Sequence, residues 1–344
     1  MENNIYINIY MKILITSYYG PNDSLYYAEK ALEKKNFEVV DYPLFKFYMD
    51  KYDKLVNYID HFTNFIIKEK PDIILWWYVG IPSEHMVLIK NKFEIKHIFF
   101  NWDEPYSWNN EDMKYKVKIF DCVFACCEET LNKYIIHGVK DAFFCLPGYD
   151  PTTHYVIEDI NQDEFNKYKC DISFCCTNLY ENTLLYPDQY INRKKLLDDI
   201  YLNQDKFNYI FNIYGPNFLE NLYPKSYKGF INYKDTNKLF NYSKINLCTH
   251  VSARRKKSIN ERTLLILGSG GLLLIDHVNG LEELVDINND CILLNKNNYL
   301  NQINQILTNY NNYKIIKKNA VKKSLNYTWN VWACNINNYL NKNI

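Results

Sequence analysis

The sequence lacks any apolar run that approaches the roughly 20 residues of a membrane-spanning helix. Its longest apolar stretch, residues 264–275, is interrupted by glycine and serine at positions 268–271. The N-terminus carries Glu2 and no basic region followed by an apolar stretch, so it does not resemble a secretory signal. These absences predict a cytoplasmic protein with no transmembrane segment.

An excess of either charge is also missing. Lys and Arg together number 40, as do Asp and Glu, which disfavours nucleic acid or a membrane surface as a partner. The ten cysteines form no CxxC pair, and the seven histidines form no HExxH motif. No Asp-x-Asp occurs, which disfavours a site where paired carboxylates bind a diphosphate through a metal. We therefore expect reduced cysteines, no metal and no bound cofactor.

Glycine is scarce, with only ten residues, while tyrosine alone contributes 32. The abundance of isoleucine, asparagine, lysine and tyrosine is typical of translation from an AT-rich genome. Where glycine is rare, it survives at positions that need positive φ or close approach of the backbone. Gly20 and Gly215 each follow an apolar run, with Pro216 next to the second. Both tight turns and contact with a ligand remain open for these two glycines.

Short apolar runs alternate with amphipathic segments along most of the chain, as in a parallel sheet that is covered by helices on both faces. The amphipathic segments include helices from about residue 23 and over residues 52–68 and 329–340. The expected strands are 12–17, 37–40, 72–76, 96–101, 121–125, 142–146, 171–175, 208–213, 244–248, 271–275 and 291–294.

The pattern of strands and helices restarts after a polar stretch at residues 159–169, so the chain is predicted to form two domains. Residues 1–158 are predicted to form an N-terminal Rossmann-like domain, and residues 170–328 a C-terminal Rossmann-like domain. Residues 159–169 are the linker, and the helix within 329–344 packs back on the first domain. Doubly wound sheets bind ligands at the carboxyl ends of their strands, so a central cleft is expected between the domains.

A basic run, Arg254 to Lys257, precedes a helix that is expected to begin near Ile259, because Ser258 and Glu261 have capping-box spacing. Gly268 is expected to end that helix with a left-handed cap. A helix N-terminus exposes unpaired N–H groups and attracts a diphosphate, and arginine adds bidentate contacts to phosphate oxygens. The alternative interpretation is a solvated basic loop. If the site is real, Arg254, Arg255 and Arg262 are its cations.

Other polar residues follow expected strands. Asp103 and Glu104 come after the strand at 96–101 and are candidates for orienting a substrate hydroxyl or acting as a base, with helix capping as the alternative. His250, after the strand at 244–248, is a candidate catalytic residue or a structural histidine. Thr177 and Asn178 follow the strand at 171–175 and are candidates to bind phosphate or base, although asparagine is also common in turns.

Several motifs appear in the order found in one known family. They are the sequences NWDEPYS at residues 101–107, LPGYDP at 146–151, IYGP at 213–216, SKINL at 243–247, NERTLL at 260–265, GG at 270–271 and GLEEL at 280–284. This series resembles the spore-maturation-type (CgeB-like) glycosyltransferases, which are relatives of the family 4 retaining enzymes. The resemblance runs from about residue 11 to residue 335.

The resemblance implies a GT-B fold, with two Rossmann-like doubly wound domains, of which residues 1–158 form the acceptor-side domain and residues 170–328 the nucleotide-sugar donor domain. It implies an enzyme that moves a sugar from a nucleoside-diphosphate sugar, with a UDP-sugar favoured, to a glycan or other hydroxyl acceptor. Retention of configuration and independence of metal are expected from the family. Gly270, Gly271, Glu282 and Glu283 join the donor-binding candidates through the same resemblance. Oligomeric state is not indicated.

One residue departs from the family pattern. Leu265 stands where the family has the glutamate that is expected to contact the donor ribose, and leucine cannot accept a hydrogen bond from a hydroxyl. Glu261, Glu282 or Glu283 then replaces it, or nucleotide recognition differs, or turnover is lost. Two alternatives to a transferase therefore stay open: a catalytically silent module that binds nucleotide or sugar, and a nucleotide-sugar epimerase.

Overall fold

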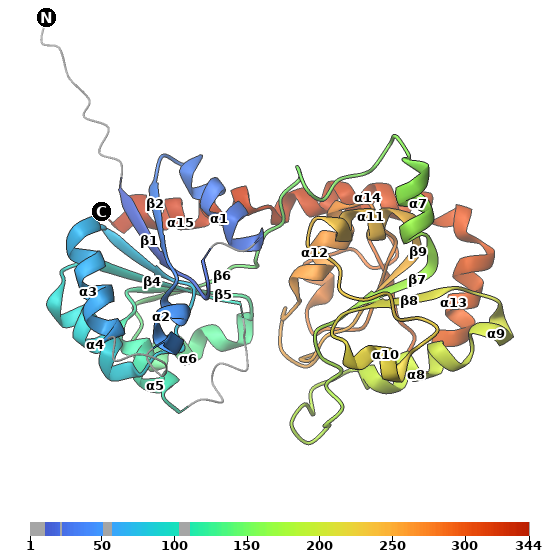
Figure 1. Ribbon diagram of the computed structural model, residues 1–344, viewed down its shortest axis with the longest axis horizontal. Helices are drawn as coiled ribbons and strands as arrows, with labels where there is room; N and C mark the ends of the chain where they lie inside the picture. Colours follow the sequence, from blue (N-terminus) through green and yellow to red (C-terminus); the bar gives the residue numbers. More distant parts are fainter. Residues whose placement is uncertain (1–10, 21–22, 51–56, 103–110, 344) are drawn as a thin grey trace, which may run out of the picture. The chain divides into compact units, whose positions relative to one another are not determined.

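The computed structural model describes residues 11–20, 23–50, 57–102 and 111–343. By internal contacts the chain divides into two compact units (Figure 1). The first unit contains residues 1–126, 130–145 and 329–344, and the second contains residues 127–129 and 146–328.

The first unit is built on a parallel sheet of six strands in the order β2-β1-β3-β4-β5-β6. The order reverses between β1 and β3, as in a doubly wound fold. The strands are β1 (Lys12–Thr16), β2 (Glu38–Tyr42), β3 (Ile73–Trp76), β4 (Lys96–Asn101), β5 (Cys122–Ala125) and β6 (Asp141–Phe144).

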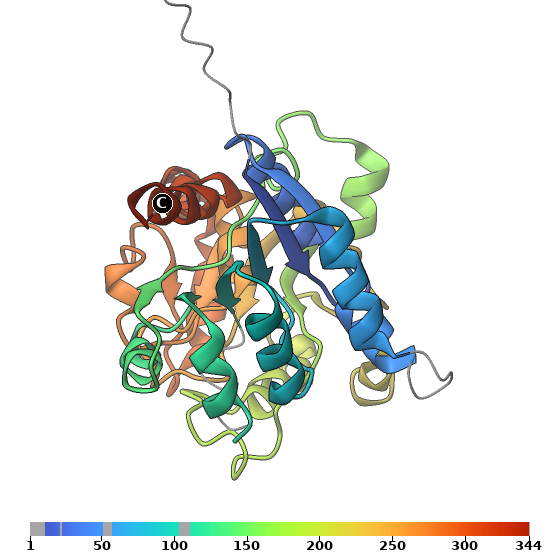
Figure 2. The same cartoon turned by 90° about the vertical axis from the view of Figure 1, so that its left-hand side faces the viewer.

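Helices cover both faces of this sheet, and Figure 2 shows α3 and α15 on opposite sides of it. Side chains alternate along each strand, so Phe99 of β4 packs in a core cluster with Phe62 of α3, whereas the neighbouring Phe100 packs against Trp332 of α15. The helices are α1 (Asp23–Glu33), α2 (Leu44–Asp50), α3 (Tyr58–Glu69), α4 (Ser83–Lys92), α5 (Met113–Lys116), α6 (Leu131–Ile136) and α15 (Trp329–Asn343).

The C-terminal helix α15 belongs to the first unit, which is where the expected helix at residues 329–340 was assigned. Its Trp329 and Trp332 lie beside Trp77, and its Tyr339 meets the edge of the Phe124 ring. Lys96 of β4 donates to the backbone oxygen of Asn343. Apolar and polar contacts therefore hold the end of the chain on the sheet that begins at residue 12.

The second unit has a parallel sheet of five strands in the order β11-β10-β9-β7-β8. Its strands are β7 (Cys170–Cys175), β8 (Phe211–Tyr214), β9 (Ser243–Cys248), β10 (Leu273–Ile275) and β11 (Ile292–Leu293). Its helices are α7 (Gln162–Tyr168), α8 (Arg193–Leu202), α9 (Gln204–Phe207), α10 (Phe218–Leu222), α11 (Asp235–Tyr242), α12 (Glu261–Gly268), α13 (Tyr299–Thr308) and α14 (Lys314–Ser324).

Each expected strand has a counterpart in these two sheets, which confirms the predicted fold class. The expected linker at residues 159–169 instead contains α7, whose N-cap Asn161 accepts from Asp163 and Glu164. Contacts with α11 place α7 in the second unit, which already begins at residue 146. The helix expected over 52–68 is described only from Tyr58, because residues 51–56 lie outside the described ranges.

The end of α12 also differs from the prediction. Gly268 lies inside the helix without a positive φ, and Gly270 has φ 67° instead. A Cβ on Gly268 would lie 2.3 Å from the Tyr149 ring, so close packing explains this glycine better than a helix cap does.

Eight of the ten cysteines are buried, as expected of small apolar residues. Among the residues that the structure describes, no helix has the length and apolar character needed to cross a membrane.

Glu29 of α1 gives the first unit a pH-dependent stability. Its side chain is buried and its Oε1 makes no hydrogen bond, so burial, assisted by Asp41, raises its pKa from 4.5 to about 7. The folded state therefore holds a proton that the unfolded chain releases at lower pH, and stability falls as pH rises from 4.5 to 7. We expect Glu29→Gln to raise the urea midpoint at pH 8 and not at pH 4.

The same change at Glu94, which is exposed, serves as the control and should leave the urea midpoint nearly unchanged at both pH values. The expected gain for Glu29→Gln at pH 8 is about 3 kcal/mol, because the pKa rises from 4.5 to about 7 and each tenfold change in proton affinity corresponds to about 1.4 kcal/mol. An equal gain at pH 4 and pH 8 would contradict the assignment.

Candidate functional site

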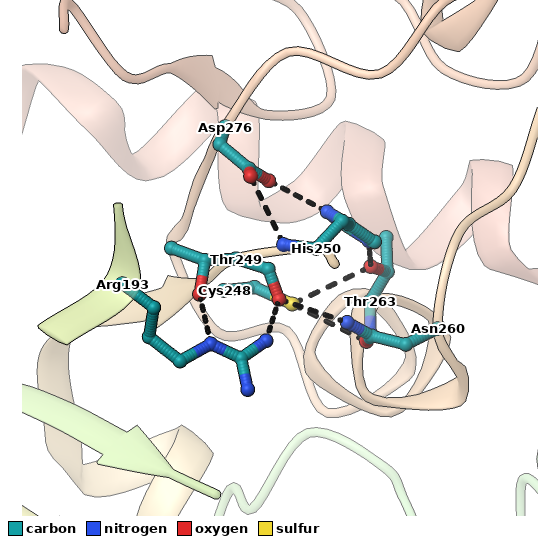
Figure 3. Close-up of polar contacts among 7 residues, drawn as sticks. All are labelled: Arg193, Cys248, Thr249, His250, Asn260, Thr263 and Asp276. Carbon is teal, nitrogen blue, oxygen red and sulfur yellow. Dashed lines mark hydrogen bonds and ion pairs between the residues drawn. The ribbon is translucent and has the colours of Figure 1, made fainter. Parts of the chain in front are cut away.

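The order of the strands in the second unit reverses between β7 and β9. From β7 the chain continues to β8 on one side, whereas β9 and β10 lie on the other. Loops that leave the carboxyl ends of two such strands diverge, and this opens space where doubly wound sheets bind ligands. The helices α8 and α12 begin after the loops that follow β7 and β9. The candidate site lies at this point (Figure 3).

The N-terminus of α12 is capped by Asn260, whose side chain accepts from the backbone N–H of Thr263 at 3.2 Å. This corrects the prediction that Ser258 caps a helix that starts near Ile259. The cap satisfies the N–H group of Thr263 and does not use that of Arg262. The sequence Asn-Glu-Arg therefore places an arginine side chain and backbone N–H donors together at the start of a helix.

Arg193, the first residue of α8, is buried and binds both loops. Its Nε donates to Thr249 Oγ1 at 2.8 Å and its Nη2 to the Thr249 backbone oxygen at 2.6 Å. Its Nη1 donates to the backbone oxygen of Asn178 at 2.9 Å. Thr249 follows β9 and Asn178 follows β7, so one guanidinium connects the two loops. All three acceptors are uncharged, which leaves the positive charge without a hydrogen-bonded carboxylate.

Arg262 and Arg193 converge on Phe174 of β7, with each guanidinium carbon 5.8 Å from the ring centroid. Burial, followed by the positive charge of Arg262, lowers the pKa of Arg193. Burial raises the pKa of Cys248, and the charge of Arg262 opposes that rise. Two like charges close together favour an anion in their vicinity. In the described part of the chain, Arg262 forms no ion pair.

His250 is held between two side chains. Its Nδ1 lies 2.6 Å from Asp276 Oδ1, its backbone N–H donates to Asp276 Oδ2 at 2.9 Å, and its Nε2 lies 3.3 Å from Thr263 Oγ1 (Figure 3). Both residues of the His–Asp pair are almost fully buried. With both ring nitrogens occupied, His250 fits a positioning role better than the catalytic role suggested by the sequence.

The basic run at residues 254–257 is largely neutralised within the second unit. Arg255 pairs with Glu129 at 2.9 Å and with Asp188 at 3.4 Å. Lys256 and Lys257 each pair with Glu128 and with Glu283. Arg254 is exposed, and no ion pair involves it among the described residues. Of the predicted arginines, Arg254 and Arg262 are thus the ones left available to an anion, while Arg255 and Glu283 are used in ion pairs.

The candidates after β7 and β8 lie at the same edge of the sheet as Arg262. Thr177 and Asn178 are exposed, and Asn178 also forms a turn by accepting from the N–H of Tyr180. Gly215 precedes Pro216, and a Cβ on it would lie 2.2 Å from the backbone oxygen of Cys176. Close approach of the loops after β7 and β8 therefore accounts for this glycine without a ligand.

Three candidate glycines lie elsewhere. Gly270 and Gly271 precede β10, at its amino end, so the structure does not bring them to the carboxyl edge that holds Arg262. A Cβ on Gly271 would lie 2.6 Å from Asn246 Nδ2, and packing explains that residue. Gly20 lies in the first unit after β1, where its N–H donates to Ser17 Oγ and φ is 108°.

The carboxylate candidates are only partly resolved by the structure. Asp103 and Glu104 lie outside the described residues. Glu282 is exposed, next to the ion-paired Glu283. Leu265 is buried in α12 with 6% of its surface exposed, so an apolar core residue stands where the resemblance implies a ribose-binding glutamate.

Asp276 and Thr249 were missed as parts of the site. Two features of the sequence could have indicated them: Asp276 ends an apolar strand, and Thr249 directly follows another. Within the described ranges, no group of three or more His, Cys, Asp or Glu side chains is placed to hold a metal ion. The site offers guanidinium and helix N–H donors, which suit a phosphorylated ligand.

One known protein family matches the part of the chain that contains the candidate site. Residues 193–336 match a family model described as "Glycosyl transferase-like". The matched segment begins at Arg193 and includes Thr249, Arg262 and Asp276. The match covers less than half of the chain. No curated protein sequence matches the chain.

Solved structures similar to the chain have the GT-B fold. Sucrose-phosphate synthase from Thermosynechococcus elongatus has a TM-score of 0.68 at 12% identity, with 97% of this chain and 98% of that chain covered. HepE from Anabaena, in complex with UDP and glucose, has a TM-score of 0.65 at 14% identity, with coverage of 97% and 100%. The catalytic domain of starch synthase IV from Arabidopsis thaliana, bound to ADP and acarbose, has a TM-score of 0.64 at 9% identity, with coverage of 96% and 98%.

The three hydrogen bonds of Arg193 predict that its shape matters as well as its charge. Arg193→Lys keeps the charge but cannot reach three acceptors that are arranged for a planar fork. We expect a loss of about 2–4 kcal/mol in unfolding free energy, from hydrogen bonds of a charged group in a buried setting. Urea denaturation measures it, and Arg254→Lys, at an exposed position, should change little. Equal losses of unfolding free energy in Arg193→Lys and Arg254→Lys would refute the conclusion that Arg193 holds the two loops together.

Proposed function

We propose that the protein transfers a sugar from a nucleoside-diphosphate sugar to the hydroxyl of a glycan or other acceptor. The observation that carries the proposal is the convergence of Arg193 and Arg262 at the β7–β9 switch point, inside the segment that matches a glycosyltransferase family. A diphosphate has the negative charge that this pair lacks, and a helix N-terminus is suited to receive it.

In the proposed reaction, the bond between the anomeric carbon and the diphosphate oxygen breaks, and negative charge develops on the departing diphosphate. Arg262 and the first N–H groups of α12 stabilise that charge, because they are already oriented by the Asn260 cap. Arg193 contributes its positive charge from a fixed position and holds the two loops at the required separation. His250 and Asp276 fix the loop after β9 from the other side.

The first donor to test is a UDP-sugar. Among the similar structures, HepE is described in complex with UDP-glucose, and starch synthase IV with ADP. These proteins share the fold at low identity, so they support the class of donor and leave the base and sugar to measurement. Buried Leu265 implies that the ribose is recognised by a residue other than the one used in the spore-maturation-type family.

The acceptor is proposed to meet the first unit at the carboxyl ends of β1 and β3. The Tyr19 ring there is 69% exposed and packs edge-on against Phe45 at 5.0 Å. Tyr18 lies 4.7 Å from Tyr78 in the same group of rings. Aromatic faces that are partly open to solvent suit the apolar face of a sugar ring. Asp103 and Glu104 remain the proposed residues for orienting the acceptor hydroxyl.

Arg262 provides the most direct test of the donor site. We expect Arg262→Ala to weaken UDP binding by about 10- to 100-fold, because hydrogen bonds to charged groups contribute about 1.5–3 kcal/mol each. Arg262→Lys should recover part of the affinity through its point charge. Calorimetric titration with UDP, in the presence of EDTA, measures the effect and tests the proposal that binding needs no divalent cation.

The control for Arg262→Ala is Lys206→Ala, which removes an exposed positive charge from α9 in the same unit. Its affinity for UDP should match that of the unchanged protein. Unchanged affinity in Arg262→Ala would contradict the phosphate assignment. UDP binding without any consumption of UDP-sugar in the presence of acceptors would favour a silent binding module instead.

The resemblance to the retaining enzymes of family 4 supports transfer with retention of the anomeric configuration. The coupling constant of the anomeric proton in the first product, followed by NMR before mutarotation, distinguishes the two outcomes. The expected product has the configuration of the donor. The opposite configuration would assign an inverting reaction and would remove the support for the spore-maturation-type relationship.

A further inference from the structure

A pocket of about 910 Å³ lies in the second unit at the opposite edge of the sheet from Arg262. Cys170 and Ser243, which line it, are the first residues of β7 and β9, and Ile210 immediately precedes β8. Figure 1 shows α7 and α14 on the same side of this sheet, and residues of both helices line the pocket. Because ligands of doubly wound sheets bind at the carboxyl ends, this pocket is separate from the proposed donor site.

One wall of the pocket is an extended segment at residues 155–160. Asn237 accepts from the backbone N–H of Tyr155 at 3.0 Å, and Asn241 accepts from that of Ile157 at 2.9 Å. These hydrogen bonds hold the segment against α11. Val156 and Ile160 line the pocket and yet are 46% and 61% exposed. These backbone hydrogen bonds thus keep the two apolar side chains exposed to water. An apolar ligand that covered them would remove the free-energy cost of that exposure.

The inner part of the pocket is aromatic. Phe165 and Tyr242 pack edge to face, with ring centroids 5.5 Å apart. Tyr242 is 8% exposed, and its buried hydroxyl has no hydrogen-bond partner within the geometric limits among the residues that the structure describes. Ile210, on the other side, is 56% exposed. The interior therefore has apolar surface and an unused hydroxyl, a combination that suits the chain and the first polar atoms of an amphiphile.

The helix α14 adds positive charge to the pocket. Lys314, Lys318 and Lys322 line it at intervals of four residues, so they lie along one side of the helix over about 12 Å. The helix has no acidic residue, and in the described part of the chain no ion pair involves these three lysines. Lys317 donates to the Tyr310 hydroxyl, and Lys244 pairs with Asp171, so those two cations are already engaged.

We propose that this pocket and the lysines of α14 dock the protein on a membrane that contains anionic phospholipid, with one acyl chain entering the pocket. The charge is complementary to phosphate groups, and the exposed apolar side chains match a hydrocarbon chain. Two signals are generally needed for stable attachment to a membrane, and the pocket combines both. The lysines extend over more than the width of one phosphate, so a surface with several anionic headgroups fits them better than a single soluble ligand.

The test is sedimentation of the full chain with vesicles of phosphatidylcholine alone, and of phosphatidylcholine with phosphatidylglycerol. Binding is expected only to the second. The triple variant Lys314→Gln, Lys318→Gln and Lys322→Gln should lower the partition coefficient by about 100-fold, at roughly fivefold for each lysine near an anionic surface. Ile160→Ser should lower it by about tenfold, since the buried side chain no longer contributes.

The matched control changes Lys140, Lys234 and Lys296 to Gln, three exposed lysines that do not line the pocket and whose loss alters the net charge equally. It should bind as the unchanged protein does. All variants replace exposed residues, and their unfolding transitions and affinity for UDP should stay the same.

Equal loss in the control and the pocket variant would overturn the proposal, as would equal binding to neutral vesicles or no binding to either. In a further measurement the protein is titrated with a soluble monoacyl phosphate, which distinguishes a single dispersed ligand from a membrane. Binding of that molecule without binding to vesicles would also overturn membrane docking, because the pocket would then serve a single dispersed ligand.

Discussion

The buried guanidinium of Arg193 is the interaction on which the arrangement of the second unit most depends. It joins the loop after β7 to the loop after β9, through Asn178 and Thr249, at the point where the order of the strands reverses. Only a planar fork with several donors satisfies acceptors on two sides of such a gap. Because these acceptors carry no charge, the interaction leaves a positive potential beside Arg262. The hydrogen bonds that hold the two loops together therefore also leave positive charge available to bind an anion.

The two edges of this sheet use positive charge in different ways. At the carboxyl edge, carboxylates neutralise most of the basic run at residues 254–257, and the available charge is concentrated at Arg262 and Arg193. At the amino edge, the lysines of α14 have no such partners among the described residues, and apolar side chains surround them. The formal net charge of zero hides this local difference. The balanced composition disfavoured a membrane surface as a partner, and the position of the charges supports one.

The fold was predictable from the sequence because the strands of a parallel sheet are buried on both faces and therefore appear as continuous apolar runs. Each expected strand has a counterpart in the structure. Boundaries and caps were less predictable. Ser258 and Glu261 have the spacing of a capping box, but Asn260 caps α12, and the difference between the two depends on tertiary packing. Thr249 is 56 residues away from Arg193 along the chain, and Asp276 is 26 residues away from His250, so no local pattern could identify these two contacts. The lysines of α14 were visible in the sequence as helical charges, but the pocket beside them was not.

A crystal structure of the protein with UDP would test the central claim most directly. The account predicts that the diphosphate lies at the start of α12, within hydrogen-bond distance of the Arg262 guanidinium and of the N–H groups of the first turn. Arg193 should keep its contacts with Asn178 and Thr249 beside it. A diphosphate bound elsewhere, with Arg262 directed into solvent, would contradict the account.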